Sequence, residues 1–198
     1  MNLAARQYTL PISPLGALDY VTQPGVWDEM VDPATGIRPH WTEVVATLAR
    51  FDAREWSARQ QRIQRLLREN GVTYNVYDDP RGYTRTWQVD PVPLVLDVAE
   101  WLGIEAGLTQ RAHLLDLILR DLYGPRRLLR EGLLPPEAVY AHGGYLRPLI
   151  DALPAERTHL AFYAADLARG PDGRVWVTAD RCQSPSGAGY AIENRSVM

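Results

Sequence analysis

The sequence predicts a mixed α/β fold of the α+β kind, in which a helical lead-in is followed by a mixed sheet. Two observations carry this prediction. Apolar residues recur at helical spacing in segments 42–70 and 98–123, which stop at Asn70-Gly71 and Gly124-Pro125. Runs of β-branched and aromatic residues, separated by turn residues, lie within 72–89 and 158–180. We therefore expect helices and short hairpins in one chain.

The composition is that of an ordinary globular protein, with 46% hydrophobic and 23% charged residues. The net charge of −3 and the pI near 5.8 provide no cationic footprint for nucleic acid or an anionic membrane. Neither a signal peptide nor a membrane-spanning run is recognisable, so we expect a cytoplasmic protein. All 21 basic residues are arginine, which excludes a lysine contact to phosphate. The single cysteine, Cys182, excludes an internal disulfide.

The chain divides into three predicted parts. Residues 1–40 are rich in proline and glycine and form an extended lead-in. Residues 41–157 form a helical and mixed α/β portion, with a capping box at Asp52 and Glu55 and a hairpin turn at 78–82. Residues 158–198 hold two strand candidates, 158–166 and 174–180, and then a small, polar tail containing glycine. The six tryptophans, Trp101 among them, are expected in the core.

Two acidic residues lie near the ends of the last two predicted strands. Pro171, Asp172 and Gly173 have the order of a three-residue hairpin loop with a left-handed glycine. Counting outward from that loop sets Asp166 opposite Thr178 and makes Asp180 its diagonal neighbour, about 7–8 Å away. Two carboxylates at that spacing can hold one divalent cation. A two-residue loop would put them on opposite faces, and aspartates at strand ends are also common as plain turn residues.

The tail after these strands resembles an anion cradle. Ser186, Gly187 and Gly189 offer backbone N–H groups, and Asn194 and Arg195 add an amide and a fork of donors suited to phosphate or carboxylate. Arg195 is the candidate catalytic residue. The alternative is a mobile loop that ends in a solvated arginine. The four histidines have no common spacing, and nothing near Cys182 identifies a base, so nucleophilic catalysis finds no support.

Several blocks of the sequence resemble the circularly permuted ATP-grasp type 2 family. They recur in the order of that family and include Trp27-Asp28-Glu29-Met30, the run Glu69 to Tyr77, Gly107-Leu108-Thr109-Gln110-Arg111, Asp121-Leu122-Tyr123-Gly124-Pro125, and Asp166 through Arg195. The resemblance implies a relative of glutathionylspermidine-synthetase-like ligases. Such enzymes use Mg²⁺ and ATP to activate a carboxylate as an acyl phosphate, which an amine then attacks.

The resemblance also implies the roles of individual residues. Asp166 matches the family's first magnesium ligand, and Asp180 falls where the family has a glutamate. Cys182 stands where an asparagine is usual, so Gln183 or Asn194 would supply the third ligand. Small carboxylates, amines or peptides are the expected substrates. We expect the chain to be the N-terminal part of such a ligase, inactive by itself, with the C-terminal remainder of the fold as its partner. The alternative is a stand-alone, non-catalytic interaction module with a degenerate ATP-grasp fold.

Overall fold

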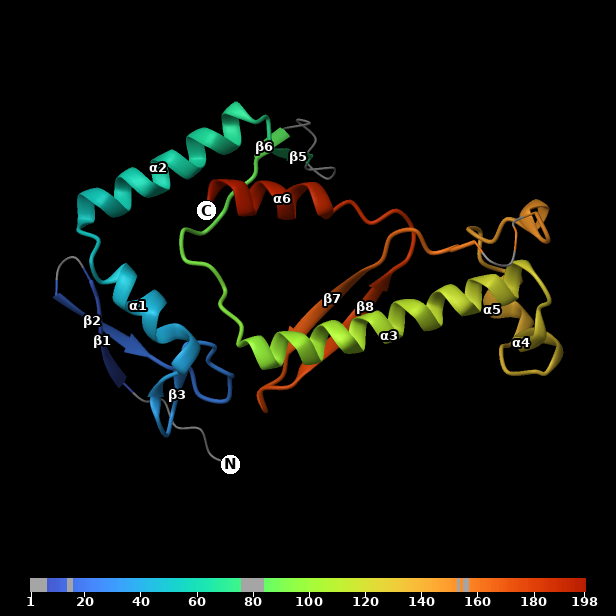
Figure 1. Cartoon of the computed structure of the whole chain (residues 1–198), viewed down its shortest axis with the longest axis horizontal. Helices are drawn as coiled ribbons and strands as arrows, with labels where there is room; N and C mark the ends of the chain where they lie inside the picture. The colour runs from blue at the N-terminus through green and yellow to red at the C-terminus, as the bar shows by residue number, and fades with distance from the viewer. Residues whose placement is uncertain (1–6, 14–15, 76–83, 153, 155–156) are drawn as a thin grey trace. The chain divides into compact units, whose positions relative to one another are not determined.

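The computed structural model describes residues 7–13, 16–75, 84–152, 154 and 157–198. It confirms a mixed α+β chain (Figure 1). Every sheet among the described residues consists of two strands. Two compact units share the chain. Unit 1 contains Met1–Val98, Ala168–Trp176 and Ser186–Met198, and unit 2 contains Ala99–Leu167 and Val177–Pro185. The predicted division at residues 40 and 157 stays a prediction.

Unit 1 begins with two short hairpins and continues with two helices. Its elements are β1 (Gln7–Ser13), β2 (Gly16–Val21), β3 (Val31–Asp32), β4 (Gly36–Ile37), α1 (Thr42–Leu48), α2 (Ala53–Glu69), β5 (Thr73–Asn75), β6 (Thr84–Thr86) and α6 (Ala188–Val197). The predicted capping box of α2 is confirmed, because Asp52 accepts the N–H of Glu55 and Glu55 accepts that of Asp52. The predicted turn at 78–82 lies outside the described residues.

The core of unit 1 joins α2 to α6. Ile63, Leu67 and Val197 are buried together, and partly buried residues of the 72–89 segment pack against them. The tail was predicted as a loop, and this prediction is wrong from Ala188 onward, where α6 begins. Its helical state depends on distant partners: Trp87 donates its indole N–H to Asn194 at 2.8 Å, and the Tyr190 hydroxyl donates to the Thr73 carbonyl at 2.7 Å.

Trp27 fixes the tip of the last hairpin within unit 1. Its ring lies under two guanidinium groups, Arg38 at 4.0 Å and Arg169 at 5.8 Å from the centroid. Arg169 also donates to Glu29 at 2.6 Å, with its side chain only 12% exposed. A Cβ on Gly173 would approach the Trp27 ring to 2.5 Å, so only glycine fits there.

Unit 2 is organised along one long helix. Its elements are α3 (Val98–Tyr123), α4 (Arg127–Arg130), α5 (Pro136–Tyr140) and most of the hairpin strands β7 (Ala164–Arg169) and β8 (Val175–Arg181). The predicted strand from 158 begins only at Ala164. The expectation that the tryptophans lie in the core is wrong for Trp101, which is 47% exposed. It lies in the first turn of α3, so no preceding helical turn lies against its side chain.

No helix within the described ranges combines the length and the apolar character needed to cross a bilayer.

Candidate functional site

The loop between β7 and β8 has the predicted geometry. The Gly170 N–H donates to the Arg174 carbonyl at 2.8 Å, and the Gly173 N–H donates to the Gly170 carbonyl at 2.9 Å. Gly173 has a φ of +81°. These are the marks of a three-residue loop closed by a left-handed glycine. Further along, the Thr178 hydroxyl donates to the Asp166 carbonyl at 3.0 Å, so the strands bring these two residues together as expected.

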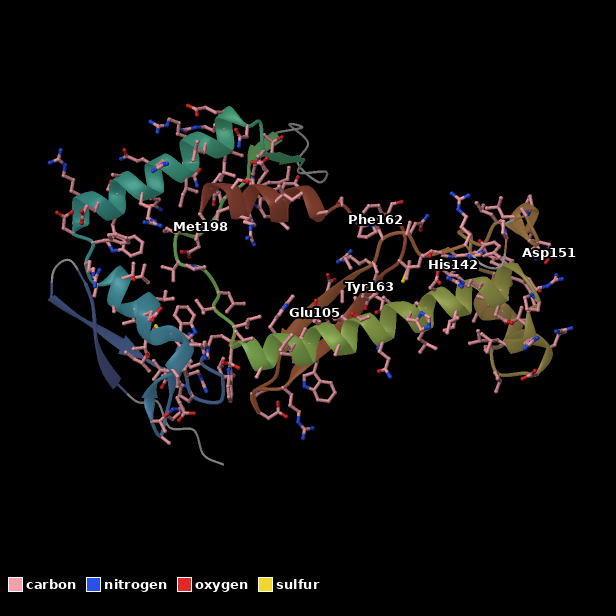
Figure 2. The ribbon with its side chains drawn as sticks, viewed as in Figure 1. Glu105, His142, Asp151, Phe162, Tyr163 and Met198 are labelled. Atoms are coloured by element: carbon pink, nitrogen blue, oxygen red, sulfur yellow. The ribbon has the colours of Figure 1, made fainter. Side chains whose placement is uncertain are left out.

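Asp180 is held from two sides within unit 2. Arg111 of α3 donates Nε to Oδ1 and Nη2 to Oδ2, both at 2.6 Å, and the Tyr163 hydroxyl donates to Oδ1 at 2.7 Å. Figure 2 labels Tyr163 beside α3 and the hairpin strands. The hydrogen bonds from Arg111 and then Tyr163 lower the pKa of Asp180 to about 2. Burial first, and then the hydrogen bond to Asp180, raise the pKa of Tyr163 to about 12. The carboxylate therefore stays charged and the phenol stays neutral at physiological pH.

Asp166 is paired in the same way with a different arginine. Arg181 donates Nε to Oδ1 at 3.0 Å and Nη2 to Oδ2 at 2.6 Å. The hydrogen bond from Arg181 lowers the pKa of Asp166. This pair is more exposed than the first, since the side chains of Arg181 and Asp166 are 61% and 43% accessible. Each of the two predicted metal ligands is thus paired with its own guanidinium group, Asp180 with Arg111 and Asp166 with Arg181, and they do not share a cation.

These residues do not fit a magnesium ion as they stand. Hard oxygen donors are the right chemistry, but every oxygen of the two carboxylates already accepts a hydrogen bond from a cation. The described residues also contain no cluster of three or more His, Cys, Asp or Glu side chains that could hold a metal. Gln183, the predicted third ligand, has its Oε1 beside the loop at Gly144. The magnesium assignment stays a prediction that requires Arg111 and Arg181 to be displaced.

Cys182 lies next to this cluster in the sequence. Burial and then the charge of Asp180 raise the pKa of its thiol, although part of the side chain is exposed. A thiol of this kind is protonated at neutral pH and is a poor nucleophile. The structure therefore adds no support for cysteine chemistry.

The predicted anion cradle coincides with the start of α6 in unit 1. Gly187 is the N-cap and has no side-chain cap, so the backbone N–H groups of the first turn have no side-chain acceptor there. Ser186 and Gly189 line a hollow of about 430 Å³, but Glu193 also lines it and adds a negative charge. Asn194 is turned into the fold by its hydrogen bond to Trp87. Arg195 is exposed.

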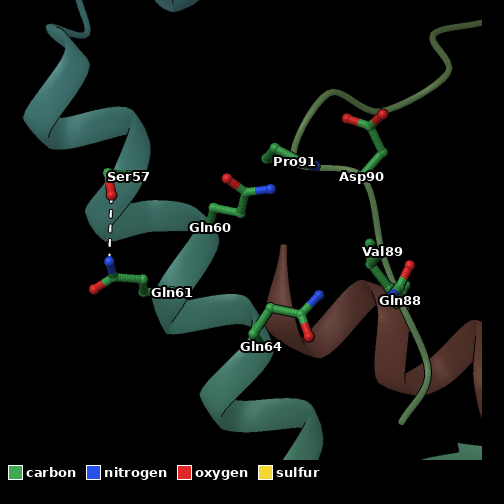
Figure 3. Close-up of a pocket in the computed structure, with 8 residues that line it drawn as sticks. All are labelled: Ser57, Gln60, Gln61, Gln64, Gln88, Val89, Asp90 and Pro91. Atoms are coloured by element: carbon green, nitrogen blue, oxygen red, sulfur yellow. Dashed lines mark hydrogen bonds between the residues drawn. The ribbon is translucent and has the colours of Figure 1, made fainter. Parts of the chain in front are cut away.

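A second hollow in unit 1, of about 620 Å³, lies between α2 and the segment 88–91 (Figure 3). Neutral amides dominate its lining, which consists of Ser57, Gln60, Gln61, Gln64, Gln88, Val89, Asp90 and Pro91. The Gln61 amide donates to the Ser57 hydroxyl at 3.3 Å. The lining has no cation, and its hydroxyl, that of Ser57, has a hydrogen bond from an amide and not to a base, so the hollow supports no catalytic role.

Sequence reasoning missed three residues of the unit 2 cluster: Arg111, Tyr163 and Arg181. Arg111 and Asp180 are 69 positions apart, and no local pattern connects them. Arg181 directly follows Asp180 in a strand that was already singled out, and Arg111 ends one of the blocks that resemble the family, but neither signal indicated an ion pair.

The mixed α+β chain is consistent with an ATP-grasp-type domain. Its last hairpin carries two aspartates, each paired with an arginine, and leads into a helix that begins at a glycine. The chain belongs to the circularly permuted ATP-grasp type 2 family, whose model matches residues 93–198, more than half of its length.

Three relatives give the extent of the similarity. An uncharacterized protein of Mycobacterium tuberculosis strain H37Rv is 41% identical over 180 residues, which cover 87% of this chain and 20% of that protein. Uncharacterized proteins of Synechocystis and Mycobacterium leprae are 31% and 32% identical over 172 residues, again 87% of this chain, and 36% and 30% of those proteins. The chain thus spans between about a fifth and a third of the length of these relatives.

Proposed function

We propose that this chain is part of an ATP-dependent carboxylate–amine ligase of the glutathionylspermidine-synthetase-like kind. Membership of the ATP-grasp family, with the match covering α3, the hairpin and α6, is the observation that carries the proposal. In the proposed reaction a carboxylate oxygen attacks the γ-phosphorus of ATP and ADP leaves. An amine then attacks the acyl carbon of the acyl phosphate, phosphate leaves, and the amine loses a proton to solvent or a base. The substrates are small carboxylates and amines or peptides.

The residues of this chain have a limited share in that chemistry. Ser186, Gly187 and Gly189 at the start of α6 would hold an anionic oxygen through backbone N–H groups, supported by the uncapped helix N-terminus. Arg195 would add a cation from the exposed side of α6. Mg²⁺ supplies charge neutralisation of the phosphates when bound, and Asp166, Asp180 and Gln183 would bind it only after their present partners leave. The chain alone is proposed to be inactive, with the remainder of the ATP-grasp fold as its partner.

One observation favours a second candidate function. Guanidinium groups hold both carboxylates that a magnesium site would use. This is the arrangement expected of a non-catalytic interaction module that has kept the fold and lost the metal. The two candidates differ in what Asp166 and Asp180 do, and that difference can be measured.

The test is ATP turnover by the longer polypeptide that contains this chain. For a ligase, Asp166→Asn or Asp180→Asn should abolish ADP formation while the circular-dichroism spectrum stays unchanged, and Glu69→Gln on an exposed part of α2 should leave turnover unchanged. Turnover that survives both aspartate substitutions would refute the metal role. Calorimetric titration of the 198-residue chain with Mg²⁺ and ATP tests whether this part lacks a complete nucleotide site, since tight binding would contradict that incompleteness.

A further inference from the structure

Asp180 binds one edge of the Arg111 guanidinium group, and Tyr163 also forms a side-chain hydrogen bond with this arginine. Nε and Nη2 form its side edge, and both donate to Asp180. A guanidinium group carries five N–H donors in a rigid plane, so the end edge, made of Nη1 and the second hydrogen of Nη2, remains. Nη1 makes no hydrogen bond to any residue that the structure describes, and the side chain is 47% exposed. Arg111 therefore presents a second planar fork to its surroundings.

The direction of this fork is fixed by its support. Asp180 cannot swing freely, because Tyr163 donates to the same carboxylate from the residues leading into β7. Tyr163 is part-buried, and the Asp180 side chain is 23% exposed, so two ordered groups lie behind one partly exposed cation. A fixed arginine loses less side-chain entropy on binding a ligand than a free surface arginine does.

Arg181 repeats the arrangement with a looser support. Its Nε and Nη2 are also bound by a carboxylate, that of Asp166, and its Nη1 likewise makes no hydrogen bond within the described ranges. Among the residues that the structure describes, no side chain comparable to Tyr163 donates to the Asp166 carboxylate besides Arg181. We therefore treat Arg111 as the principal residue and Arg181 as a weaker repetition of it.

We propose that Arg111 is a metal-independent binding site for an oxyanion with two adjacent oxygens, a phosphate or a carboxylate, and that Asp180 and Tyr163 are its positioning residues. The free fork has the shape for bidentate contact with either group. The chain has no lysine, so its permanently cationic side chains are all arginines. This proposal gives Asp166 and Asp180 the role of orienting arginines, which agrees with the second candidate function and differs from their proposed role as magnesium ligands. The alternative is a purely structural role, in which the ion pair between Arg111 and Asp180 joins α3 to β8 and binds no ligand.

The experiment is titration of the 198-residue chain, labelled with ¹⁵N-arginine, with inorganic phosphate and separately with acetate. Saturable shifts of the Arg111 guanidinium resonances are expected with at least one of them, and which probe binds more tightly distinguishes phosphate from carboxylate. Binding should be the same with Mg²⁺ and with a chelator. Absence of saturable shifts with both probes, or binding that needs Mg²⁺, would overturn the proposal.

Variants separate the site from general charge. Followed at the backbone amide resonances of uniformly ¹⁵N-labelled protein, Arg111→Gln and Arg111→Lys should each weaken binding roughly ten- to hundredfold, since charge-assisted hydrogen bonds are lost and lysine has no fork. Arg130→Gln makes the same change of charge on the exposed side of α4 and should have no effect. Tyr163→Phe should weaken binding a few-fold while the fold is retained, which covers the case in which Arg111→Gln fails to fold. Equal loss in Arg130→Gln, or none in either Arg111 variant, would contradict the assignment.

The oxyanion proposal goes beyond the ligase proposal, and the two can fail separately. The first concerns binding by this chain without metal. The second concerns ATP turnover by the longer polypeptide.

Discussion

Asp116 is a buried acidic side chain of unit 2, and its removal should cost stability there. It is 5% exposed. Its Oδ1 accepts the backbone N–H groups of His159 at 2.7 Å and Leu160 at 2.8 Å, and its Oδ2 accepts Arg120 Nη2 at 2.7 Å. One carboxylate thus attaches α3 to the segment that leads to Tyr163.

The expected loss follows from these contacts. Asp116→Ala leaves two backbone N–H groups and the Arg120 cation without their acceptor, at about 1–3 kcal/mol for each unsatisfied buried group. Because neighbouring losses are not additive, we expect a decrease of about 3–5 kcal/mol in the free energy of unfolding. Asp116→Asn keeps an acceptor oxygen but removes the charge, and should cost about 1–3 kcal/mol.

Urea unfolding measures the global loss, and amide hydrogen exchange at His159 and Leu160 measures the local one. Both amides should exchange faster in Asp116→Ala. The control is Glu69→Ala, because Glu69 is 61% exposed and lies 3.8 Å from Arg65, which predicts a change below about 0.5 kcal/mol. If Asp116→Ala also changed the free energy of unfolding by less than about 0.5 kcal/mol and left exchange at both amides unaltered, the reasoning would be refuted.

The same carboxylate predicts a dependence on pH. Burial alone would raise the pKa of Asp116, but the N–H groups of Leu160 and His159 and the charge of Arg120 lower it below its ordinary value of 3.8. The folded-state pKa is therefore depressed, so its contribution to stability is present above pH 3.8 and is lost as the pH falls through the folded value. Acid unfolding of the wild type should include this loss, and Asp116→Asn should lack it.

Three further predictions concern other parts of the chain. Gly173→Ala should lower the free energy of unfolding by about 1–3 kcal/mol in urea, because of its φ of +81° and the Trp27 ring; Asp172→Ala, one position earlier, should cost less. Asn194→Leu should cost about 1–3 kcal/mol and shift the indole N–H resonance of Trp87, and an unmoved resonance would disprove that hydrogen bond. Absorbance titration should show Tyr163 ionising near pH 12. The stability that comes from its raised pKa is therefore present below pH 10 and is lost as the pH rises towards 12. Ionisation of Tyr163 at pH 10 would contradict its contact with Asp180.

The elements that were predicted correctly are those specified by neighbouring residues. The capping box that begins α2 spans four positions, and the loop at 171–173 spans three, so their side chains and backbone requirements can be read in sequence. The long helix α3 ends at Tyr123, next to the glycine and proline that predicted its end. Local signals of this kind need no knowledge of the rest of the fold.

The features that were missed depend on residues far apart. The tail contains three glycines or serines within a few positions and has little intrinsic helix preference, yet α6 forms because Trp87, Thr73 and Leu67 cover one of its sides. In the same way, the position of Asp180 in the hairpin was predictable, whereas its pairing with Arg111 from another element was not. The sequence indicated which residues carry charge but not which charges meet.

The core formed by Ile63, Leu67 and Val197 has a consequence for synthesis on the ribosome. Leu67 and Val197 are 197 − 67 = 130 positions apart, so the partner of α2 is made long after α2 itself. At roughly 5–20 residues per second, that delay is on the order of ten seconds. During this time only nearer residues such as Val72, Trp87 and Val89 can cover α2, so part of this apolar core stays exposed in the nascent chain until α6 has left the exit tunnel.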